Sequence, residues 1–270
     1  MAHFLKVLAR SRSWSFARDF GARDSDPPGE PASVAWWSGD GRPVHYRRGT
    51  SDVALVYDIL FKPGAKSEYW LPAELAPRTI LDIGGNIGVA ARYLAHRFPG
   101  AALHTFEPIA ENCELLRRNM NGGAAIIHGF GLGARSGPRE FGQDPGAERN
   151  RGGYSLARAG GGAVRAELRA VPEALALLGG APIDLIKIDV EGAEEEILAA
   201  FPDAVLEQAT WIYGELHSDS VDPRQAFRLL ERLAAWFDIE VHKPLRKRNW
   251  FFDACNRRVS ERFRAFRRRR

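Results

Sequence analysis

The chain has 270 residues, which is enough for one α/β domain with a large buried core. Apolar residues make up 45% of the sequence and charged residues 27%, a composition that excludes a disordered or fibrous protein. The two cysteines, Cys113 and Cys255, stand far apart and form no CxxC pair. This excludes a disulfide framework and a cysteine zinc site, and it favours a reducing compartment.

Charge is distributed unevenly along the chain. Residues 242–270 contain 12 Lys or Arg against two acidic residues, so this segment carries about +10 while the whole chain carries +4. We expect a basic carboxyl-terminal tail that attracts an anionic partner such as nucleic acid, a phosphorylated glycan or lipid headgroups. The alternative is a solvated terminus that binds no partner.

The amino-terminal residues do not resemble a targeting segment. Lys6, Arg10, Arg12 and Arg18 interrupt the apolar positions of the first twenty residues, and no later apolar stretch approaches the length needed to span a bilayer. We therefore expect no signal peptide, no transmembrane segment and a cytoplasmic location.

The predicted elements divide the chain into an amino-terminal cap, residues 1–70, and a domain over residues 71–241. In the cap, Thr50-Ser51-Asp52 predicts the start of a helix that ends at Pro63-Gly64. From residue 79 strands alternate with helices, which predicts a parallel sheet with right-handed crossovers. The expected strands are 79–83, 103–106, 125–128, 183–190, 210–216 and 239–241, and the expected helices are 87–98, 109–120, 171–178, 193–200 and 223–236.

The segment from residue 129 to residue 162 is rich in glycine and arginine. It is too long for a simple connection between a strand and a helix, so we expect a small hairpin or a mobile loop over the site.

Ligands of an open parallel sheet bind beyond the carboxyl ends of its strands. Asp82, Glu107, Asp189 and His217 each end or follow a predicted strand, so we expect them around one crevice. Such a crevice is the expected place for the chemistry of the chain.

The run Asp82-Ile83-Gly84-Gly85-Asn86-Ile87-Gly88 joins the first strand to its helix. The glycines allow a tight turn and a close approach of the backbone to a ligand. A dinucleotide fingerprint has the spacing G-x-G-x-x-G, which this run lacks. A carboxylate at Asp82 is a poor neighbour for pyrophosphate, whereas it suits the cationic amino group of a methionine moiety. The run therefore favours S-adenosylmethionine, against the alternative of an ordinary strand-to-helix turn.

Glu107 ends the second strand in the sequence Phe106-Glu107-Pro108. A carboxylate at that place can accept hydrogen bonds from both hydroxyls of a ribose, although this does not separate one adenosine-containing ligand from another. The alternative is a solvated helix-capping glutamate.

The fourth strand carries charged residues as it ends. Lys187, Asp189 and Glu191 alternate onto one side, while the intervening apolar residues are expected to be buried. Two carboxylates and an ammonium in one crevice are costly unless they are paired or used in chemistry. A structural ion pair between Lys187 and Asp189 is the alternative to a catalytic role.

Together these motifs resemble the FkbM family of methyltransferases. The resemblance rests on DIGGNIG, on FEP with Asn112 five residues after the glutamate, on IKIDVEGAE, and on the E-x-H element Glu215-Leu216-His217, and it covers about residues 50–241. It implies a class I, Rossmann-like fold with a mostly parallel seven-stranded sheet and helices on both faces. It also implies O-methylation of natural products, sugars or glycans with S-adenosylmethionine. The residues that would line the cofactor site are Asp82, Gly84, Asn86, Gly88, Glu107 and Asn112.

Methyl transfer to a hydroxyl requires alignment of the acceptor and removal of its proton. The candidates for that base, or for orienting the acceptor, are Asp189, Glu191 and His217, the last because an unperturbed imidazole titrates near neutral pH. We expect no metal, with Mg²⁺ bound by Asp189, Glu191, Glu215 and His217 as the alternative. The expected acceptor is a small molecule or a glycan.

Two further functions are compatible with a cofactor site of this kind. A nucleic-acid methyltransferase would suit the basic tail, but enzymes that methylate base amino groups resemble Asn-Pro-Pro-Tyr where this chain reads Asp189-Val190-Glu191-Gly192. A non-catalytic module that binds S-adenosylmethionine is the second. A nicotinamide dehydrogenase is disfavoured by the glycine spacing.

Overall fold

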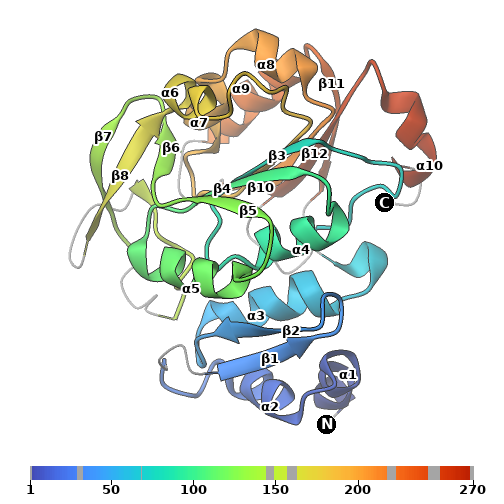
Figure 1. Ribbon diagram of the computed structural model, residues 1–270, viewed down its shortest axis with the longest axis vertical. Helices are drawn as coiled ribbons and strands as arrows, with labels where there is room; N and C mark the ends of the chain where they lie inside the picture. The colour runs from blue at the N-terminus through green and yellow to red at the C-terminus, as the bar shows by residue number, and fades with distance from the viewer. Residues whose placement is uncertain are drawn as a thin grey trace.

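The computed structural model describes residues 2–28, 33–67, 69–143, 149–156, 163–217, 223–242 and 250–267. A seven-stranded sheet with the order β11-β12-β10-β9-β3-β4-β5 forms the centre of the molecule (Figure 1). All neighbours from β10 to β5 are parallel, whereas β12 runs antiparallel to both β10 and β11. The strands are β3 (Thr79–Ile83), β4 (Ala102–Phe106), β5 (Ala125–His128), β9 (Leu185–Ile188), β10 (Trp211–Leu216), β11 (Phe237–His242) and β12 (Trp250–Asn256). The predicted mostly parallel seven-stranded sheet is confirmed.

Helices cover both faces of this sheet (Figure 1). The strand β3 shows why: Ile80 belongs to one buried apolar cluster, while its neighbours Leu81 and Ile83 belong to another on the opposite face. The first cluster includes α4 (Val89–Arg97) and α5 (Ala110–Met120). The second lies under α6 (Val171–Ala176), α7 (Glu194–Ala199), α8 (Asp203–Gln208) and α9 (Pro223–Leu233). No helix in the described ranges is long and apolar enough to cross a membrane.

The amino-terminal part packs against the α4 and α5 side and shares its apolar cluster. It contains α1 (Ala2–Ser11), α2 (Trp14–Ala22), β1 (Ser33–Trp37), β2 (Arg42–Tyr46), α3 (Ser51–Val56), a π-helical turn (Tyr57–Phe61) and a 3₁₀ turn (Gly64–Lys66). The helix α3 begins as predicted, because the Thr50 hydroxyl accepts a hydrogen bond from the Asp52 amide at 3.2 Å. This region therefore forms a layer over one edge of the domain.

A second, smaller sheet lies beside the main one (Figure 1). Its strands β6 (Gly131–Gly133) and β7 (Gly137–Phe141) belong to the glycine-rich segment, β8 (Val164–Ala170) follows that segment, and their order in the sheet is β6-β8-β7. The prediction of a small hairpin or a mobile loop over residues 129–162 did not include β8, which pairs antiparallel with β7 from beyond that segment. Residues 144–148 and 157–162 of this segment lie outside the described residues.

The carboxyl-terminal part corrects one expectation. The prediction that the sheet is complete at residue 241, with a separate tail beyond it, is wrong because β12 lies between β10 and β11. Beyond β12 follow a 3₁₀ turn (Ser260–Phe263) and α10 (Arg264–Arg267). The ring centroids of Phe263 and Phe266 lie 5.4 and 5.9 Å from the ring centroid of Trp211. Three of the twelve basic residues expected in a tail, Arg262, Arg264 and Arg267, belong to these elements, whereas residues 243–249 and 268–270 lie outside the described part.

Candidate active site

A cavity of about 280 Å³ opens at the carboxyl ends of β3, β4 and β9, where the sequence predicted a crevice. The turns after these strands contribute Gly84, Asn86, Glu107, Asp189 and Glu191 to its wall. Other lining residues come from the cap, the small sheet and β10, and include Ser51, Leu55, Asp58, Gly131, Leu132, Phe141, Tyr154, Leu168 and Glu215. The cavity is therefore enclosed by three parts of the chain that lie far apart in sequence.

The turn after β3 requires glycine where the sequence places it. Gly84 has a φ of 84°, and a Cβ atom there would lie 1.8 Å from the carbonyl oxygen of Asp189. Gly88 has a φ of 83° and approaches the backbone of Leu116 on α5 so closely that a Cβ would lie 3.1 Å from its Cα. Gly84 thus lines the pocket, whereas Gly88 lies behind it and allows α5 to pack.

Glu107 is held rigidly at the wall of the pocket. Its Oε2 accepts a hydrogen bond from the Asn86 amide at 2.7 Å, and its Oε1 accepts one from the Ile109 amide at 2.9 Å. The residue is 5% exposed, and this burial raises the pKa of Glu107 to about 7 although the two amides act in the opposite direction. The carboxylate is thereby fixed in one orientation at the end of β4.

Asp82 does not line the pocket. Its side chain is fully buried behind the turn, where Oδ2 accepts a hydrogen bond from the Thr105 hydroxyl at 2.7 Å and Oδ1 lies 3.1 Å from Lys187 Nζ. Lys187 also donates to the carbonyl of Gly84 at 2.5 Å. Burial alone would lower the pKa of Lys187, but the carboxylates of Asp82 and Asp189 outweigh it and raise the pKa. Lys187 therefore forms its ion pair with Asp82, whereas the sequence had offered a pair with Asp189 as the alternative to a catalytic role, and the Asp82–Lys187 pair supports the turn after β3.

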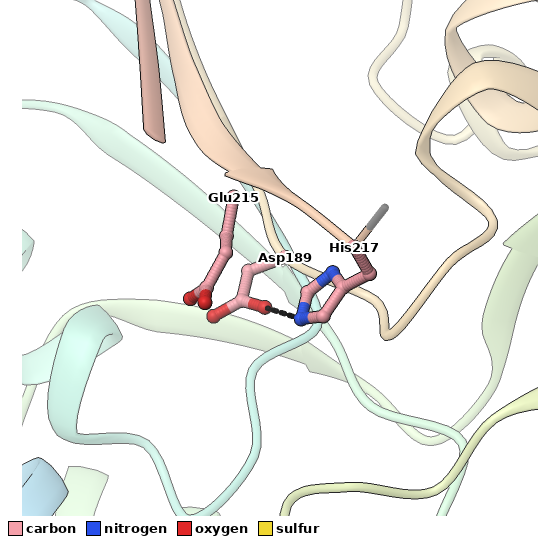
Figure 2. A group of neighbouring side chains, drawn as sticks. All are labelled: Asp189, Glu215 and His217. Carbon is pink, nitrogen blue, oxygen red and sulfur yellow. Dashed lines mark ion pairs between the residues drawn. The ribbon is translucent and has the colours of Figure 1, made fainter. Parts of the chain in front are cut away.

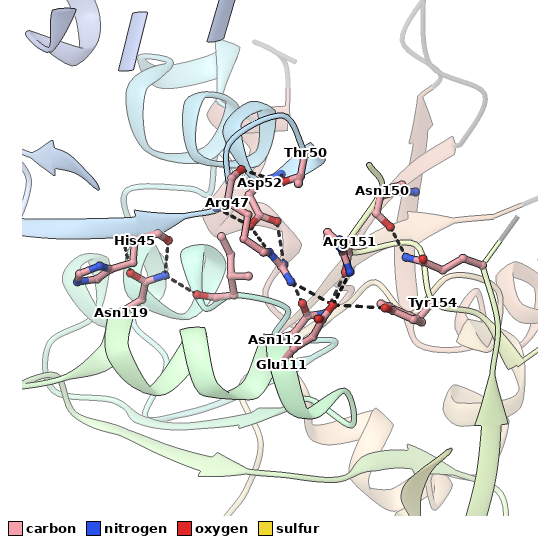
Figure 3. Close-up of polar contacts among 12 residues, drawn as sticks. His45, Arg47, Thr50, Asp52, Glu111, Asn112, Asn119, Asn150, Arg151 and Tyr154 are labelled. Atoms are coloured by element: carbon pink, nitrogen blue, oxygen red, sulfur yellow. Dashed lines mark hydrogen bonds and ion pairs between the residues drawn. The ribbon is translucent and has the colours of Figure 1, made fainter. Parts of the chain in front are cut away.

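Asn112 also lies behind the wall, in a network that Figure 3 shows. Its Oδ1 accepts a hydrogen bond from Arg47 Nη2 at 2.8 Å, and its Nδ2 donates to the carbonyl of Arg151 at 3.1 Å. Arg47 is itself buried, with Nε 2.7 Å from Asp52 Oδ2 and Nη1 3.2 Å from Glu111 Oε1. The network joins the cap, α5 and the loop of the small sheet, so Asn112 positions the segments around the pocket.

His217 follows β10 and is 4% exposed. Its Nδ1 lies 2.7 Å from Glu194 Oε1, and its Nε2 lies 3.5 Å from Glu191 Oε2. Figure 2 shows the ion pair of Nε2 with Asp189 Oδ1, at 3.8 Å. Burial opposes a charged imidazole, but the hydrogen bond that the ring donates to Glu194 and the surrounding carboxylates raise the pKa of His217 to about 10. The expected group of Asp189, Glu191 and His217 is thus brought together, with His217 behind the two carboxylates that line the cavity.

Glu194 is the residue that sequence reasoning missed. It is 3% exposed, and besides contacting His217 its Oε1 accepts hydrogen bonds from the amides of Val190 and Gly192 at 3.2 and 3.1 Å. It thereby holds the turn that carries Glu191, whose φ of 57° is unusual for a residue other than glycine. Its position at the end of the motif IKIDVEGAE was the only signal, because an acid at the start of a helix is ordinary.

The sequence that carries these residues matches a known protein family. The family model described as the methyltransferase FkbM domain matches residues 82–251. The chain belongs to the FkbM methyltransferase family. The FkbM match begins at Asp82 and ends at the second residue of the missed strand β12, whereas the amino-terminal cap lies outside it.

Known proteins share parts of this FkbM domain. The chain is 31% identical over 175 residues to the AMB antimetabolite synthetase AmbE of Pseudomonas aeruginosa, covering 51% of this chain and 8% of AmbE. It is 31% identical over 151 residues to the methyltransferase sdnD of Sordaria araneosa, covering 44% of this chain and 58% of sdnD. The solved methyltransferase FkbM from Methylobacillus flagellatus is 16% identical with a TM-score of 0.48, covering 69% of this chain and 46% of that one. The chain thus spans less than two thirds of each relative.

Proposed function

We propose that this FkbM-family protein is an S-adenosylmethionine-dependent O-methyltransferase that acts on a hydroxyl of a sugar, a glycan or a secondary metabolite. The observation that carries this proposal is the fixed Glu107 carboxylate beside the bare backbone of Gly84, in one cavity with Asp189 and Glu191. The cavity would thereby hold a nucleoside-type cofactor next to a carboxylate that can act as base for the acceptor, at the ends of neighbouring strands.

The residues at the β3 and β4 ends fit the adenosine and methionine parts of the cofactor. Glu107 would accept hydrogen bonds from the ribose hydroxyls, since its two oxygens are held in place by backbone amides. Asn86 Oδ1 is buried at the pocket wall without a hydrogen-bond partner among the described residues, and a ligand N–H group would satisfy it. Asp82 would act indirectly, by supporting the turn.

The residues at the β9 end would handle the acceptor. The cofactor would supply a methyl group bound to a positively charged sulfur, and S-adenosylhomocysteine would be the leaving group. Asp189 and Glu191 both line the cavity, and a carboxylate of this pair would accept the hydroxyl proton as the acceptor oxygen attacks the methyl carbon. His217 would orient them from behind, through its contacts at 3.5 and 3.8 Å.

The charge of the cavity supports an acceptor without phosphate groups. Five of the lining residues are acidic, and the described lining residues include no Lys or Arg. Carboxylates repel phosphate, so this lining disfavours a nucleic-acid acceptor, whose binding depends on contacts between phosphates and basic side chains. Neutral or amino-substituted hydroxyl compounds fit the cavity better.

The test is transfer of a labelled methyl group from S-adenosylmethionine to a panel of hydroxylated sugars and secondary metabolites, with mass spectrometry of the product. We expect O-methylated product, and we expect Asp189→Asn to lower turnover far more than it lowers affinity for S-adenosylhomocysteine. A non-catalytic binding module would retain that affinity and give no product with any acceptor, which would contradict the proposal.

A further inference from the structure

Three side chains with metal-binding groups converge at the carboxyl ends of β9 and β10. Asp189 directly follows β9, Glu215 lies near the end of β10, and His217 follows it (Figure 2). The two strands are parallel neighbours in which Ile188 pairs with Gly214, so the residues after that pair emerge side by side. One ligand atom from each of the three lies within 4.8 Å of the other two.

His217 is oriented as a metal ligand would be. It is 96% buried, since only 4% of its surface is exposed, and its Nδ1 is committed to Glu194 at 2.7 Å. This leaves Nε2 directed at the carboxylates of Asp189 and Glu191, with which it forms ion pairs when the imidazole is charged, and an ion bound there would displace the Nε2 proton. The separation of 3.8 Å between Nε2 and Asp189 Oδ1 resembles that of two ligand atoms around one ion, which lie roughly 3–4 Å apart for bonds of about 2.1 Å.

We propose that Asp189, Glu215 and His217 bind a divalent transition-metal ion at the acceptor end of the pocket. The sequence predicted no metal and left Mg²⁺ as the alternative, but a buried imidazole in the ligand set favours an ion such as Mn²⁺ or Zn²⁺ that accepts nitrogen as well as oxygen. Glu194 completes the arrangement, because a metal-bound histidine commonly donates its other ring N–H to a carboxylate.

The site faces the cavity, since Asp189 and Glu215 both line it. Three protein ligands leave further coordination positions, which is typical of metal sites that also bind substrate oxygen. A bound ion would hold the acceptor hydroxyl there and favour its deprotonation. This role rests on the proposed methyl transfer, whereas binding of the ion does not.

Titration of the untagged full chain with Mn²⁺ alone, followed by electron paramagnetic resonance, tests the site. We expect one bound ion per chain, displaced by Zn²⁺, and a ¹⁴N coupling in the electron spin-echo spectrum from the directly bound imidazole of His217. Failure of Mn²⁺ to bind at millimolar concentration, or bound Mn²⁺ without ¹⁴N coupling, would overturn the proposal. The spectrum is recorded on the wild-type protein, so this result does not depend on whether a variant folds.

Variants then locate the ion. We expect His217→Ala and Glu215→Gln to weaken Mn²⁺ binding at least about tenfold, and Glu194→Gln to weaken it by about 10- to 100-fold because the imidazole loses its orienting partner. The matched control is Glu114→Gln, an exposed carboxylate on α5 that should leave affinity unchanged. Wild-type affinity in folded His217→Ala would refute the assignment. The Mn²⁺ titration contains no S-adenosylmethionine, so it tests the metal site independently of the methyl-transfer assay. Mn²⁺ binding without methyl transfer would refute only the proposed function, and methyl transfer without Mn²⁺ binding would refute only the metal site.

Discussion

The buried ion pair between Asp82 and Lys187 yields a sharp stability prediction. Their side chains are 0% and 2% exposed, so Asp82→Asn leaves the ammonium without its countercharge in a site that water does not reach. Removal of one partner from a buried pair costs about 3–5 kcal/mol. Because the free energy of unfolding of such domains is about 5–15 kcal/mol, we expect Asp82→Asn to lose a large part of the total stability.

Urea denaturation followed by circular dichroism measures this loss as a free energy of unfolding. The double variant Asp82→Asn with Lys187→Met should recover much of it, because both charges are then removed, and the double-mutant cycle gives the coupling between the two side chains. Asp203→Asn, which breaks an exposed pair with Arg232, should cost less than about 1 kcal/mol. Near wild-type stability in Asp82→Asn combined with lost affinity for S-adenosylhomocysteine would show that Asp82 contacts the cofactor directly, and would refute the supporting role.

Three further predictions follow from the pocket and the cap. Burial raises the pKa of Glu107 from 4.5 to about 7, so the protonated side chain contributes stability that is fully present below about pH 4.5 and is lost as the pH rises through about 7. The free energy of unfolding should fall by up to about 3 kcal/mol over this range. Urea titrations of the wild type at pH 5 and pH 8 should show this fall, and an equal fall in Glu107→Gln would contradict the prediction. Gly84→Ala should lower the free energy of unfolding by at least about 1–3 kcal/mol and abolish binding of S-adenosylhomocysteine in a calorimetric titration, because its Cβ would lie 1.8 Å from a backbone oxygen and its φ is 84°. The control is Gly100→Ala, whose Cβ would have no atom within 4 Å. Similar behaviour of the two variants would contradict the steric argument. Arg47→Met should lower the free energy of unfolding by about 3–5 kcal/mol, measured by thermal or urea unfolding, because it leaves the fully buried Asp52 carboxylate without its ion-pair partner. An unchanged free energy of unfolding would mean that the network does not join the cap to the domain.

Most of the fold follows from the sequence because the strands of a parallel sheet are continuous apolar runs. The bounds of β3 and β5 were predicted to the residue, and the helices α4 and α5 to within a few residues. The strand β12 was missed because its short aromatic run stands between basic segments, which suggested a solvated tail. Only the tertiary structure shows that this run completes the sheet between β10 and β11.

The site was predictable to the extent that strand ends determine it. Glu107, Asp189 and Glu191 lie at the cavity because each follows a strand at the same edge of the sheet. The role of Asp82 was not predictable, because it depends on the register that sets Asp82 beside Lys187 on the neighbouring strand β9. Register between strands that lie about a hundred residues apart cannot be read from local pattern.

The role of Glu194 depends in the same way on a long-range contact. Its partner His217 lies on a different strand end, and the two meet only because β9 and β10 are neighbours. The first residue of a short helix offered no local reason to expect a buried hydrogen bond to an imidazole.

Calorimetric titration with S-adenosylhomocysteine tests the central claim most directly, namely that the cavity beside Glu107 is the cofactor site. We predict binding to one site per chain. At pH 8, above the pKa of Glu107, we predict that Glu107→Ala weakens binding by about 100-fold or more, because the two ribose hydroxyls would each lose a hydrogen bond to a charged carboxylate that contributes about 1.5–3 kcal/mol. The exposed control Glu114→Ala should bind as the wild type does. Absence of binding to the wild type, or equal affinity in Glu107→Ala, would contradict the account.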